Sequence, residues 1–396
     1  VCMLLFEQNI IDGTDEEKQA VQSGSKSAYS FMLEKIENLD ITPAQLALDP
    51  CSGSCVVTDT QTGEVLALVT YPGYDNNRLT NSIDSDYYNK IYYDLSQPMW
   101  NYATQQLSAP GSTFKMVSAA TALENNVVGL NETITCKGTW DTLSPPARCW
   151  IAPNGSHGPL DISGAIEHSC NYFFYEVGYR LSRNNGVYDS DTGLEKLAYY
   201  ADQFGLSDKS GVEISESAPK VSDFDAIRSA IGQGTNNYST VGLARYVTTV
   251  ANSGSCYNLS LLSKATDADG NLIADYTPTL RNTVDLKQST WDAIHQGMRK
   301  VVEDKDYYKD LTIQVAGKTG TAQENRKRAN HALFVCYAPY EQPQIAIATR
   351  IAFGYASDYA AQVTKDIVKY YFKLEDESSL ITGTAESTNV VQSAGD

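Results

Sequence analysis

A serine and a lysine stand three positions apart where a helix is expected to begin. Ser112 and Lys115 follow the helix-breaking pair Pro110-Gly111, and the apolar residues after them recur with helical spacing. Residues i and i+3 share one face of a helix, so the serine hydroxyl and the lysine amine can meet. A neutral lysine amine can take the serine proton and so create a nucleophile. The free N–H groups of the helix start can also hold an oxyanion.

A second serine lies two positions before an asparagine, in Ser169-Cys170-Asn171. These residues fall on a helix predicted from about Ile162 to Leu181, where apolar residues repeat with helical spacing. A hydroxyl and an amide placed together in this way could relay a proton and hold a substrate amide.

A third group, Lys318-Thr319-Gly320-Thr321, follows residues 311–315, whose apolar side chains alternate as in a half-buried strand. Lys318 would bring positive charge and Thr319 a hydroxyl group. Gly320 would allow the backbone of a ligand to approach the strand edge closely.

The first two spacings also occur elsewhere in the chain, at Ser23 and Lys26 and at Ser182 and Asn184. An isolated match is explained by ordinary surface residues, because short motifs produce many false positives. The three groups described above differ because they occur together, in the order Ser-x-x-Lys, Ser-x-Asn and Lys-Thr-Gly. This is the set found in serine β-lactamases and penicillin-binding proteins.

The elements that would position these groups follow an α+β order. Two apolar runs on either side of residues 59–63 predict a β-hairpin, and residues 71–109 are expected to be mostly loop. Helices follow in the middle of the chain. Two further strands, Leu333 to Ala338 and Ile345 to Ile351, precede a helix from Asp358 to Lys373. We expect the N-terminal hairpin to join the C-terminal strands in one antiparallel sheet.

The composition is that of a globular protein, with 42% hydrophobic and 20% charged residues among 396. It excludes collagen-like, low-complexity and wholly disordered chains. The net charge of −18 disfavours nucleic acid as a partner, because an acidic surface repels phosphates. No stretch reaches the roughly 20 apolar residues that cross a bilayer.

Further stretches resemble landmarks of the transpeptidase domain of class B penicillin-binding proteins. They are Gly63 to Val69, Tyr71 to Asp75, Ala109 to Lys115, Gly232 to Gly234 and Lys318 to Gln323. The resemblance implies a serine β-lactamase/transpeptidase-like fold, with an antiparallel sheet of about five strands and helices on both sides.

The resemblance also implies a division of the chain. Residues 1–49 would be the remnant of a non-catalytic N-terminal pedestal, and residues 50–373 would form the transpeptidase (penicillin-binding) domain. Residues 374–396, rich in Ser, Thr, Gly and acidic residues, are expected to be a flexible acidic tail.

The activity implied by the resemblance is peptidoglycan D,D-transpeptidation, with no cofactor required for catalysis. Ser112 would attack the carbonyl of a D-Ala-D-Ala stem peptide, and Lys115 would act as the base. Ser169 and Asn171 would shuttle protons and bind the donor. The amine of a second stem peptide would resolve the acyl-enzyme and form a cross-link, and β-lactam antibiotics would acylate the same serine.

The strand motif would bind the substrate in the same picture. Lys318 and Thr319 would hold the substrate carboxylate at the edge that Gly320 leaves open. The backbone N–H groups of Ser112 and Thr321 would form the oxyanion hole.

The stretch 136–171 resembles elongation-type enzymes of the penicillin-binding protein 2 kind more than division-type enzymes. Such enzymes act with a membrane glycan polymerase of the shape, elongation, division and sporulation class. The chain starts at Val1, and we expect a membrane anchor to precede it in a longer protein. The resemblance therefore implies a location at the extracytoplasmic face of the bacterial cell membrane.

Three cysteines and one histidine, Cys136, Cys149, His157 and Cys170, fall within one short window. This donor set suits a tetrahedral Zn²⁺ ion with a structural role, since four protein ligands leave no open position. The gaps between the residues are not those of paired zinc knuckles. A Cys136–Cys149 disulfide and unpaired buried thiols are the alternatives, and an extracytoplasmic location would favour the disulfide.

Two other classes of function remain open. The same motifs occur in hydrolases, so a D,D-carboxypeptidase or a β-lactamase is the first alternative. A non-enzymatic β-lactam sensor is the second. A Ser-His-Asp hydrolase is disfavoured because the chain has no G-x-S-x-G sequence.

Overall fold

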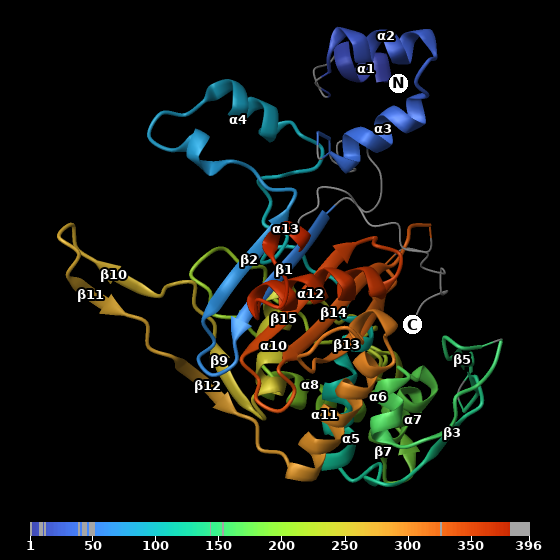
Figure 1. Cartoon of the computed structure of the whole chain (residues 1–396). Helices are drawn as coiled ribbons and strands as arrows, with labels where there is room; N and C mark the ends of the chain where they lie inside the picture. Colours follow the sequence, from blue (N-terminus) through green and yellow to red (C-terminus); the bar gives the residue numbers. More distant parts are fainter. Residues whose placement is uncertain are drawn as a thin grey trace.

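In this computed structural model, the structure describes residues 2–7, 11, 13–38, 40–41, 46, 52–142, 144–152, 154–324 and 327–380. Its centre is a five-stranded antiparallel sheet in the order β13-β14-β15-β1-β2 (Figure 1). The strands are β1 (Ser52–Asp59), β2 (Val65–Tyr71), β13 (Ala316–Ala322), β14 (His331–Ala338) and β15 (Ile345–Ala352). The predicted joining of the N-terminal hairpin to the C-terminal strands is therefore confirmed.

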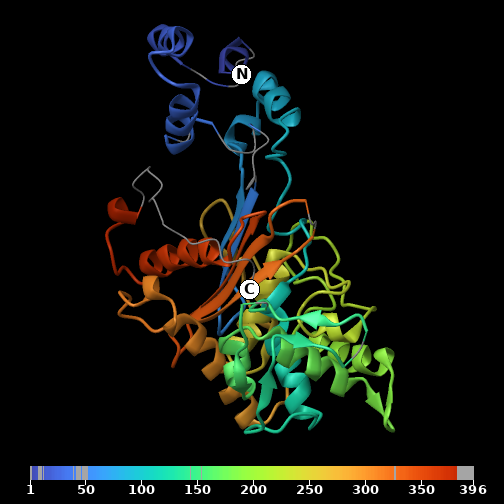
Figure 2. The same ribbon diagram turned by 90° about the vertical axis from the view of Figure 1, so that its right-hand side faces the viewer.

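Helices cover both faces of the sheet, as Figure 2 shows. On one face, α12 (Ser357–Tyr371) packs against β14 and β15. On the other face, α10 (Thr240–Ala251) packs against β15 and β1, and all of its residues are buried. Because both faces are covered, β14 is buried along its whole length and reads as a continuous apolar run.

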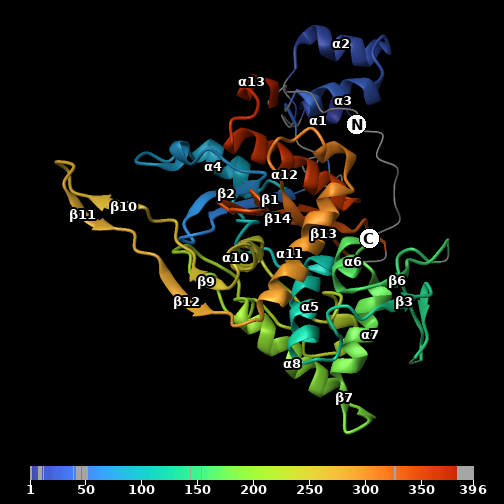
Figure 3. The same cartoon turned by 60° about the horizontal axis from the view of Figure 1, so that its bottom comes forward.

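The helical layer on the α10 side also carries the elements that matter for the site. It includes α5 (Lys115–Glu124), α6 (Ile162–Glu167), α7 (Asn171–Leu181), α8 (Ser190–Gln203) and α11 (Gln288–Glu303). Figure 3 shows α5 in the middle of this layer, in contact with α7, α8 and α11. The predicted α+β fold with helices on both sides of the sheet is confirmed.

The hairpin turn between β1 and β2 lies where the sequence places it. The Asp59 carboxylate accepts hydrogen bonds from the backbone N–H groups of Gln61, at 2.8 Å, and Thr62, at 2.9 Å. Gly63 follows with a φ of 76°, in the left-handed region that favours glycine.

Residues 71–109 are mostly loop, as expected, and also contain the 3₁₀ helix η2 (Asn76–Leu79) and the helix α4 (Ser85–Tyr92), each capped by an aspartate. Two local expectations differ from the structure. The alternating residues 311–315 are not a strand. The side chains of Leu311 and Ile313 pack on the apolar cluster beneath α12, but ladder pairing with β14 begins only at Ala316.

The second difference concerns the helix predicted from Ile162 to Leu181, which is broken into α6 and α7. Ser169 lies between them with a φ of 49°, a left-handed conformation that interrupts the helical hydrogen bonds. Cys170 then caps α7, and its Sγ accepts the N–H of Phe173 at 3.5 Å.

The N-terminal helices form a small core of their own, apart from the two apolar clusters that flank the sheet. They are α1 (Cys2–Glu7), α2 (Asp15–Ser23) and α3 (Ala28–Glu37), and they lie together beyond one end of the sheet (Figure 1). Their core contains Phe6, Ile11, Phe31 and Ile41. Among the residues that the structure describes, no helix has the length and apolar character needed to span a membrane.

The remaining elements are short. The strand pairs are β3 (Ile134–Cys136) with β6 (Gly158–Leu160), β4 (Thr139–Trp140) with β5 (Ala147–Arg148), β7 (Arg183–Asn184) with β8 (Val187–Tyr188), β9 (Ser255–Asn258) with β12 (Thr279–Thr283), and β10 (Lys264–Thr266) with β11 (Leu272–Asp275). The short helices are η3 (Gly111–Phe114), α9 (Ala226–Ser229), η4 (Asp306–Tyr308) and α13 (Glu377–Leu380). The expected acidic tail, residues 374–396, lies mostly outside the described residues. The last described residues belong to α13.

Candidate active site

Ser112 lies in η3, at a point where backbone segments approach one another unusually closely. Gly111 has a φ of 53°, and a Cβ atom on it would lie 2.5 Å from the carbonyl oxygen of Thr321. A Cβ atom on Gly232 would lie 1.9 Å from the carbonyl oxygen of Gly111. The Gly111 N–H donates to the Gly232 carbonyl at 3.1 Å. The two glycines thus let the Ser112 turn fit between β13 and the Gly232 turn.

Lys115 connects the first two predicted groups. Its side chain is completely buried, and its Nζ donates to the Ser169 carbonyl at 2.7 Å, to Ser169 Oγ at 3.1 Å and to Asn171 Oδ1 at 2.7 Å. It lies one helical turn after Ser112, at the start of α5. The structure therefore brings together the Ser-x-x-Lys and Ser-x-Asn groups.

The break between α6 and α7 is what makes this contact possible. In a continuous helix the Ser169 carbonyl would accept a hydrogen bond from the following turn. The left-handed conformation of Ser169 turns both its carbonyl and its hydroxyl toward Lys115. Asn171 follows directly as the first residue of α7.

The third group lies within β13, which is an edge strand of the sheet. Lys318 is completely buried, and its Nζ donates to the Thr319 carbonyl at 3.1 Å. A Cβ atom on Gly320 would lie 2.7 Å from Thr113 Cγ2 and 3.0 Å from the Pro110 carbonyl oxygen. The space above Gly320 therefore receives the Ser112 turn. The approach of a ligand backbone to the edge of β13 stays a prediction.

A cleft of about 560 Å³ opens at Ser112. Three of the predicted residues, Ser112, Asn171 and Thr321, line this cleft. Lys115, Ser169, Lys318, Thr319 and Gly320 are buried residues outside its lining. The cleft is also lined by Trp150, Tyr175, Arg228, Ile231, Gln233, Gln323 and Asn330.

Some of these additional lining residues had a signal in the sequence. Trp150, Gln233 and Gln323 lie inside stretches that resemble family landmarks, although none was assigned a role. Tyr175 and Arg228 belong to no motif, and only the fold brings them to the cleft. Trp150 is held there by its indole N–H, which donates to the carbonyl of His168 at 3.1 Å.

The predicted Cys–His group is also brought together. One donor atom from each of Cys136, Cys149, His157 and Cys170 lies within 4.8 Å of the others. Cys149 Sγ is 4.0 Å from Cys170 Sγ and 3.6 Å from His157 Nδ1. The three cysteines are buried free thiols, so the Cys136–Cys149 disulfide does not form in this structure. Cys51, another cysteine of the chain, lies outside the described residues.

The electrostatics of this cluster favour thiolates at Cys136 and Cys149. A hydrogen bond from the Cys170 thiol lowers the pKa of both Cys149 and Cys136, and His157 contributes in the same direction. The same contacts raise the pKa of Cys170 itself, because adjacent thiolates disfavour a further negative charge. Thiolates around one point are the donors that a soft divalent cation requires.

Comparison with known proteins gives a relationship over most of the chain. The family described as "Penicillin binding protein transpeptidase domain" matches residues 53–369. The protein "Peptidoglycan D,D-transpeptidase MrdA" of Haemophilus influenzae is 30% identical over 362 residues, covering 82% of this chain and 53% of that protein. The chain thus spans about half the length of the curated relatives it matches.

Two solved structures are similar to this one. The complex between the penicillin-binding protein PBP2 and MreC from Helicobacter pylori aligns with a TM-score of 0.65 at 25% identity, over 82% of this chain and 61% of that chain. The ceftriaxone acyl-enzyme complex of penicillin-binding protein A from M. tuberculosis shares the fold, with a TM-score of 0.70 at 21% identity, over 85% and 74% of the two chains. With its family match over most of its length, the chain belongs to the penicillin-binding protein transpeptidase domain family.

Proposed function

We propose that the chain is the catalytic part of a peptidoglycan D,D-transpeptidase that acts through an acyl-enzyme on Ser112. The observation that carries this proposal is the buried Lys115 side chain, which lies one helical turn from Ser112 and binds the Ser169–Asn171 turn. The family membership and the MrdA relative support the same activity.

The chemistry follows from this geometry. Ser112 Oγ attacks the carbonyl carbon of the stem peptide, and its proton passes to the Lys115 amine. The carbonyl oxygens around Lys115 Nζ accept hydrogen bonds and so stabilise the ammonium that forms. Backbone N–H groups of Ser112 and Thr321 stabilise the oxyanion. The Lys115 ammonium returns this proton to the amine of the terminal D-Ala, which leaves. The amine of a second stem peptide then attacks the ester and gives up a proton, which restores the Ser112 hydroxyl.

Labelling with a fluorescent penicillin tests the nucleophile. The wild-type protein should become covalently labelled, and Ser112→Ala should not. Ser118→Ala serves as a matched control, because Ser118 is a buried serine on α5, the helix that directly follows η3, and its hydroxyl donates to the Ala230 carbonyl. A persisting label in Ser112→Ala would overturn the assignment.

The hydrolase and sensor alternatives are separated by the fate of the acyl-enzyme. A penicilloyl-enzyme that lasts for hours excludes a β-lactamase. Incubation with a D-Ala-D-Ala peptide and an amine acceptor should give the cross-linked product from a transpeptidase. A carboxypeptidase would give only the shortened peptide, and a sensor would give neither product.

We also propose that the protein works in cell-wall elongation, at the extracytoplasmic face of the bacterial membrane and with a membrane glycan polymerase as partner. The resemblance of the stretch 136–171 to penicillin-binding protein 2 enzymes supports this. The H. pylori PBP2 with a similar structure is bound to MreC, a protein of that relative's assembly. Depletion of the full-length protein should give rounded cells, whereas filamentous cells would indicate a role in division.

We further propose that Cys136, Cys149, His157 and Cys170 bind a structural Zn²⁺ ion. Their donor atoms lie within 4.8 Å of one another, and three sulfurs with one imidazole nitrogen are a typical tetrahedral zinc set. The ion would fix the loop that carries Trp150 against the Ser169–Asn171 turn.

Metal analysis of protein purified without added zinc tests the site. About one equivalent is expected for the wild type and a large loss for Cys136→Ser. The control Cys256→Ser changes a buried cysteine that is not part of the cluster and should retain the metal. Less than a tenth of an equivalent in the wild type would refute the proposal.

A further inference from the structure

One tyrosine of α10 reaches the turn that carries Ser112. The Tyr246 hydroxyl donates to the backbone carbonyl of Thr113 at 3.1 Å. Thr113 lies directly after Ser112 and two residues before Lys115. This hydrogen bond therefore joins the backbone between the serine and the lysine to a helix that packs on β15 and β1.

The side chain of Thr113 is held from other directions. Its hydroxyl donates to the Pro110 carbonyl at 2.8 Å, and its Cγ2 atom lies over Gly320 of β13. The carbonyl of Ser112 accepts the Lys115 N–H where the 3₁₀ turn passes into α5. Tyr246 thus adds a polar contact from the side of α10 to a turn that is otherwise held by β13 and by its own backbone.

The hydroxyl of Tyr246 is not needed to fill space in the core. The residue is completely buried, and its ring packs edge-to-face against Phe204 at a centroid distance of 5.7 Å. A phenylalanine ring would make the same contact without the cost of removing a hydroxyl from water. Burial raises the pKa of Tyr246, so the hydroxyl keeps its proton and remains a hydrogen-bond donor.

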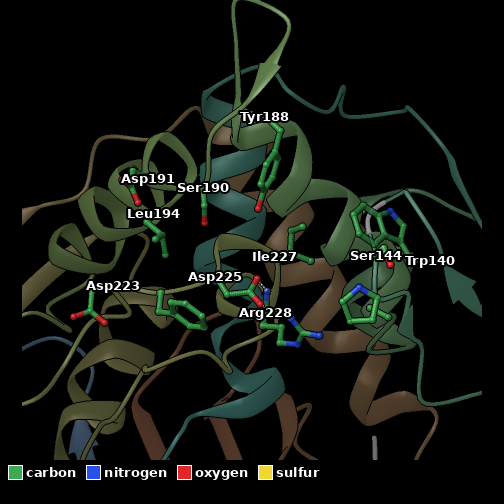
Figure 4. Close-up of a pocket in the computed structure, with 13 residues that line it drawn as sticks. Trp140, Ser144, Tyr188, Ser190, Asp191, Leu194, Asp223, Asp225, Ile227 and Arg228 are labelled. Atoms are coloured by element: carbon green, nitrogen blue, oxygen red, sulfur yellow. Dashed lines mark hydrogen bonds and ion pairs between the residues drawn. The ribbon is translucent and has the colours of Figure 1, made fainter.

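Tyr246 lines neither the cleft at Ser112 nor the cavity beside it. The cavity has a volume of about 360 Å³ and shares Arg228 with the cleft. Figure 4 shows the side chains that line it, among them Tyr188 and Leu194. A ligand in either space therefore meets other residues, and Tyr246 acts on Ser112 through the backbone of Thr113.

We propose that Tyr246 is a positioning residue, which sets the separation of Ser112 Oγ and Lys115 Nζ by holding the Thr113 carbonyl. The proposal rests on the acyl-enzyme function proposed above. Transfer of the serine proton to the lysine requires the two atoms to come within hydrogen-bond reach, and a small displacement of either slows the reaction. Without the hydroxyl, the peptide group of Thr113 loses its link to α10, and the residues on either side of it can shift.

Tyr246→Phe tests the proposal by removing the hydroxyl alone. Acylation by a chromogenic β-lactam is followed by stopped flow over a range of concentrations, which separates the dissociation constant of the noncovalent complex from the limiting rate constant. The limiting rate constant should fall about five- to tenfold, the effect of one lost hydrogen bond. The dissociation constant should stay within about twofold, because the residues that line the cleft are unchanged.

Tyr308→Phe is the matched control. Tyr308 is a buried tyrosine in the apolar cluster beneath α12, and its hydroxyl also donates to a carbonyl within a helix, that of Ala361, at 2.9 Å. This variant should lose a similar amount of resistance to urea and keep the wild-type rate constant. An equal fall of the rate constant in both variants, or no fall in Tyr246→Phe, would overturn the proposal. A weaker noncovalent complex with an unchanged rate constant would also overturn it.

Phe204→Leu is a second variant, which keeps the hydroxyl but removes the ring that packs against Tyr246. The limiting rate constant should fall about two- to threefold. Combined with Tyr246→Phe, the change should cause no further fall, because both act through the same hydrogen bond. Two effects that multiply independently would indicate a general loosening of the core and would contradict the proposal. If circular dichroism shows that Tyr246→Phe does not fold, an unchanged rate constant in Phe204→Leu contradicts it.

Labelling with a fluorescent penicillin separates this proposal from the function on which it rests. Normal labelling of the wild type, with equal acylation rate constants in wild type and Tyr246→Phe, would refute only the role of Tyr246. Absence of labelling in the wild type would refute the proposed function.

Discussion

Glycine is required at positions 111 and 232 if the turn that carries Ser112 is to pack against β13. Both residues have positive φ angles, and at both a side chain would collide with backbone atoms. Backbone atoms cannot move aside as the end of a flexible side chain can. The position of the nucleophile is therefore fixed by the absence of side chains as much as by the hydrogen bonds of Lys115.

Gly232→Ala should displace the Ser112 turn, because its Cβ would lie 1.9 Å from the Gly111 carbonyl oxygen. We expect the rate of penicillin acylation to fall by at least tenfold and the free energy of unfolding to fall by about 2–4 kcal/mol. Stopped-flow acylation and urea unfolding measure the two effects.

Gly270→Ala is the control for backbone strain alone. Gly270 also has a positive φ, of 86°, but nothing lies within 4 Å of the position that a Cβ atom on it would take. It should lose about 1 kcal/mol of stability and keep its acylation rate. Equal acylation rates in the two variants would show that the close approach at Gly232 does not position Ser112.

At the scale of elements, one imidazole ties together the ends of three strands. His331 begins β14, its Nδ1 accepts the N–H of Phe353 just after β15 at 3.1 Å, and its Nε2 donates to Glu324 just after β13 at 2.6 Å. Burial lowers the pKa of His331, and nearby Arg350 and Arg328 act in the same direction, whereas Glu324 opposes them. The neutral ring is thus the form that the native state favours.

Stability should therefore fall as the pH decreases through about 6.5, the ordinary histidine pKa, because the unfolded chain binds the proton more readily. His331→Asn, which keeps an acceptor near the Phe353 N–H, should show a smaller loss of unfolding free energy between pH 7.5 and pH 5.5. His295, whose pKa burial also lowers, preserves part of the dependence.

His168→Asn is the control for this pH dependence, since the His168 side chain is 42% exposed. It removes a histidine without touching the contacts of His331 with Phe353 and Glu324. Urea unfolding at the two pH values gives the comparison. An unchanged pH dependence in His331→Asn would show that the strand-end contacts do not depend on a neutral ring.

The elements also show what a single sequence can predict. Regular periodicity identified the sheet strands β14 and β15 and the helix α12. The sequence did not reveal the break at Ser169. Ser169 has a left-handed conformation and a new helix, capped by the sulfur of Cys170, begins directly after it, so the apolar residues keep their helical spacing across the break. The strand at Lys318 was shifted because residues 311–315 alternate for reasons of packing and not of strand pairing.

The candidate site also contains residues that the sequence could predict and residues that it could not. The buried side chains of the site belong to short motifs with fixed spacing, so the sequence was enough to find them. Tyr175 and Arg228 reach the cleft only because α7 and α9 pack against each other. No local pattern encodes a contact between two helices so far apart in the chain.

On the scale of the whole molecule, the N-terminal helices and the sheet domain have separate apolar cores. The boundary predicted at residue 49 falls just before β1, which begins at Ser52. Removal of residues 1–49 should therefore leave the penicillin acylation rate within about twofold of the original, since the core around Ser112 is unchanged.

A longer deletion, which removes residues 1–59 and with them β1, is the matched control. β1 lies between β15 and β2, so its loss should abolish folding and labelling. Circular dichroism and penicillin labelling of both truncated chains make the comparison. Loss of labelling in the shorter deletion would show that the N-terminal helices are part of the catalytic unit.

The place of β1 in the sheet also determines when the domain can fold. β1 is among the first parts of the domain to leave the ribosome, yet one of its neighbours, β15, is among the last. Until β15 is synthesised, β1 and β2 form a hairpin with one side unpaired, which is at best marginally stable. Such long-range pairing makes folding slow and leaves the sheet incomplete until synthesis is nearly finished. A chain whose sheet is still incomplete is one that can be threaded through a narrow channel before it folds.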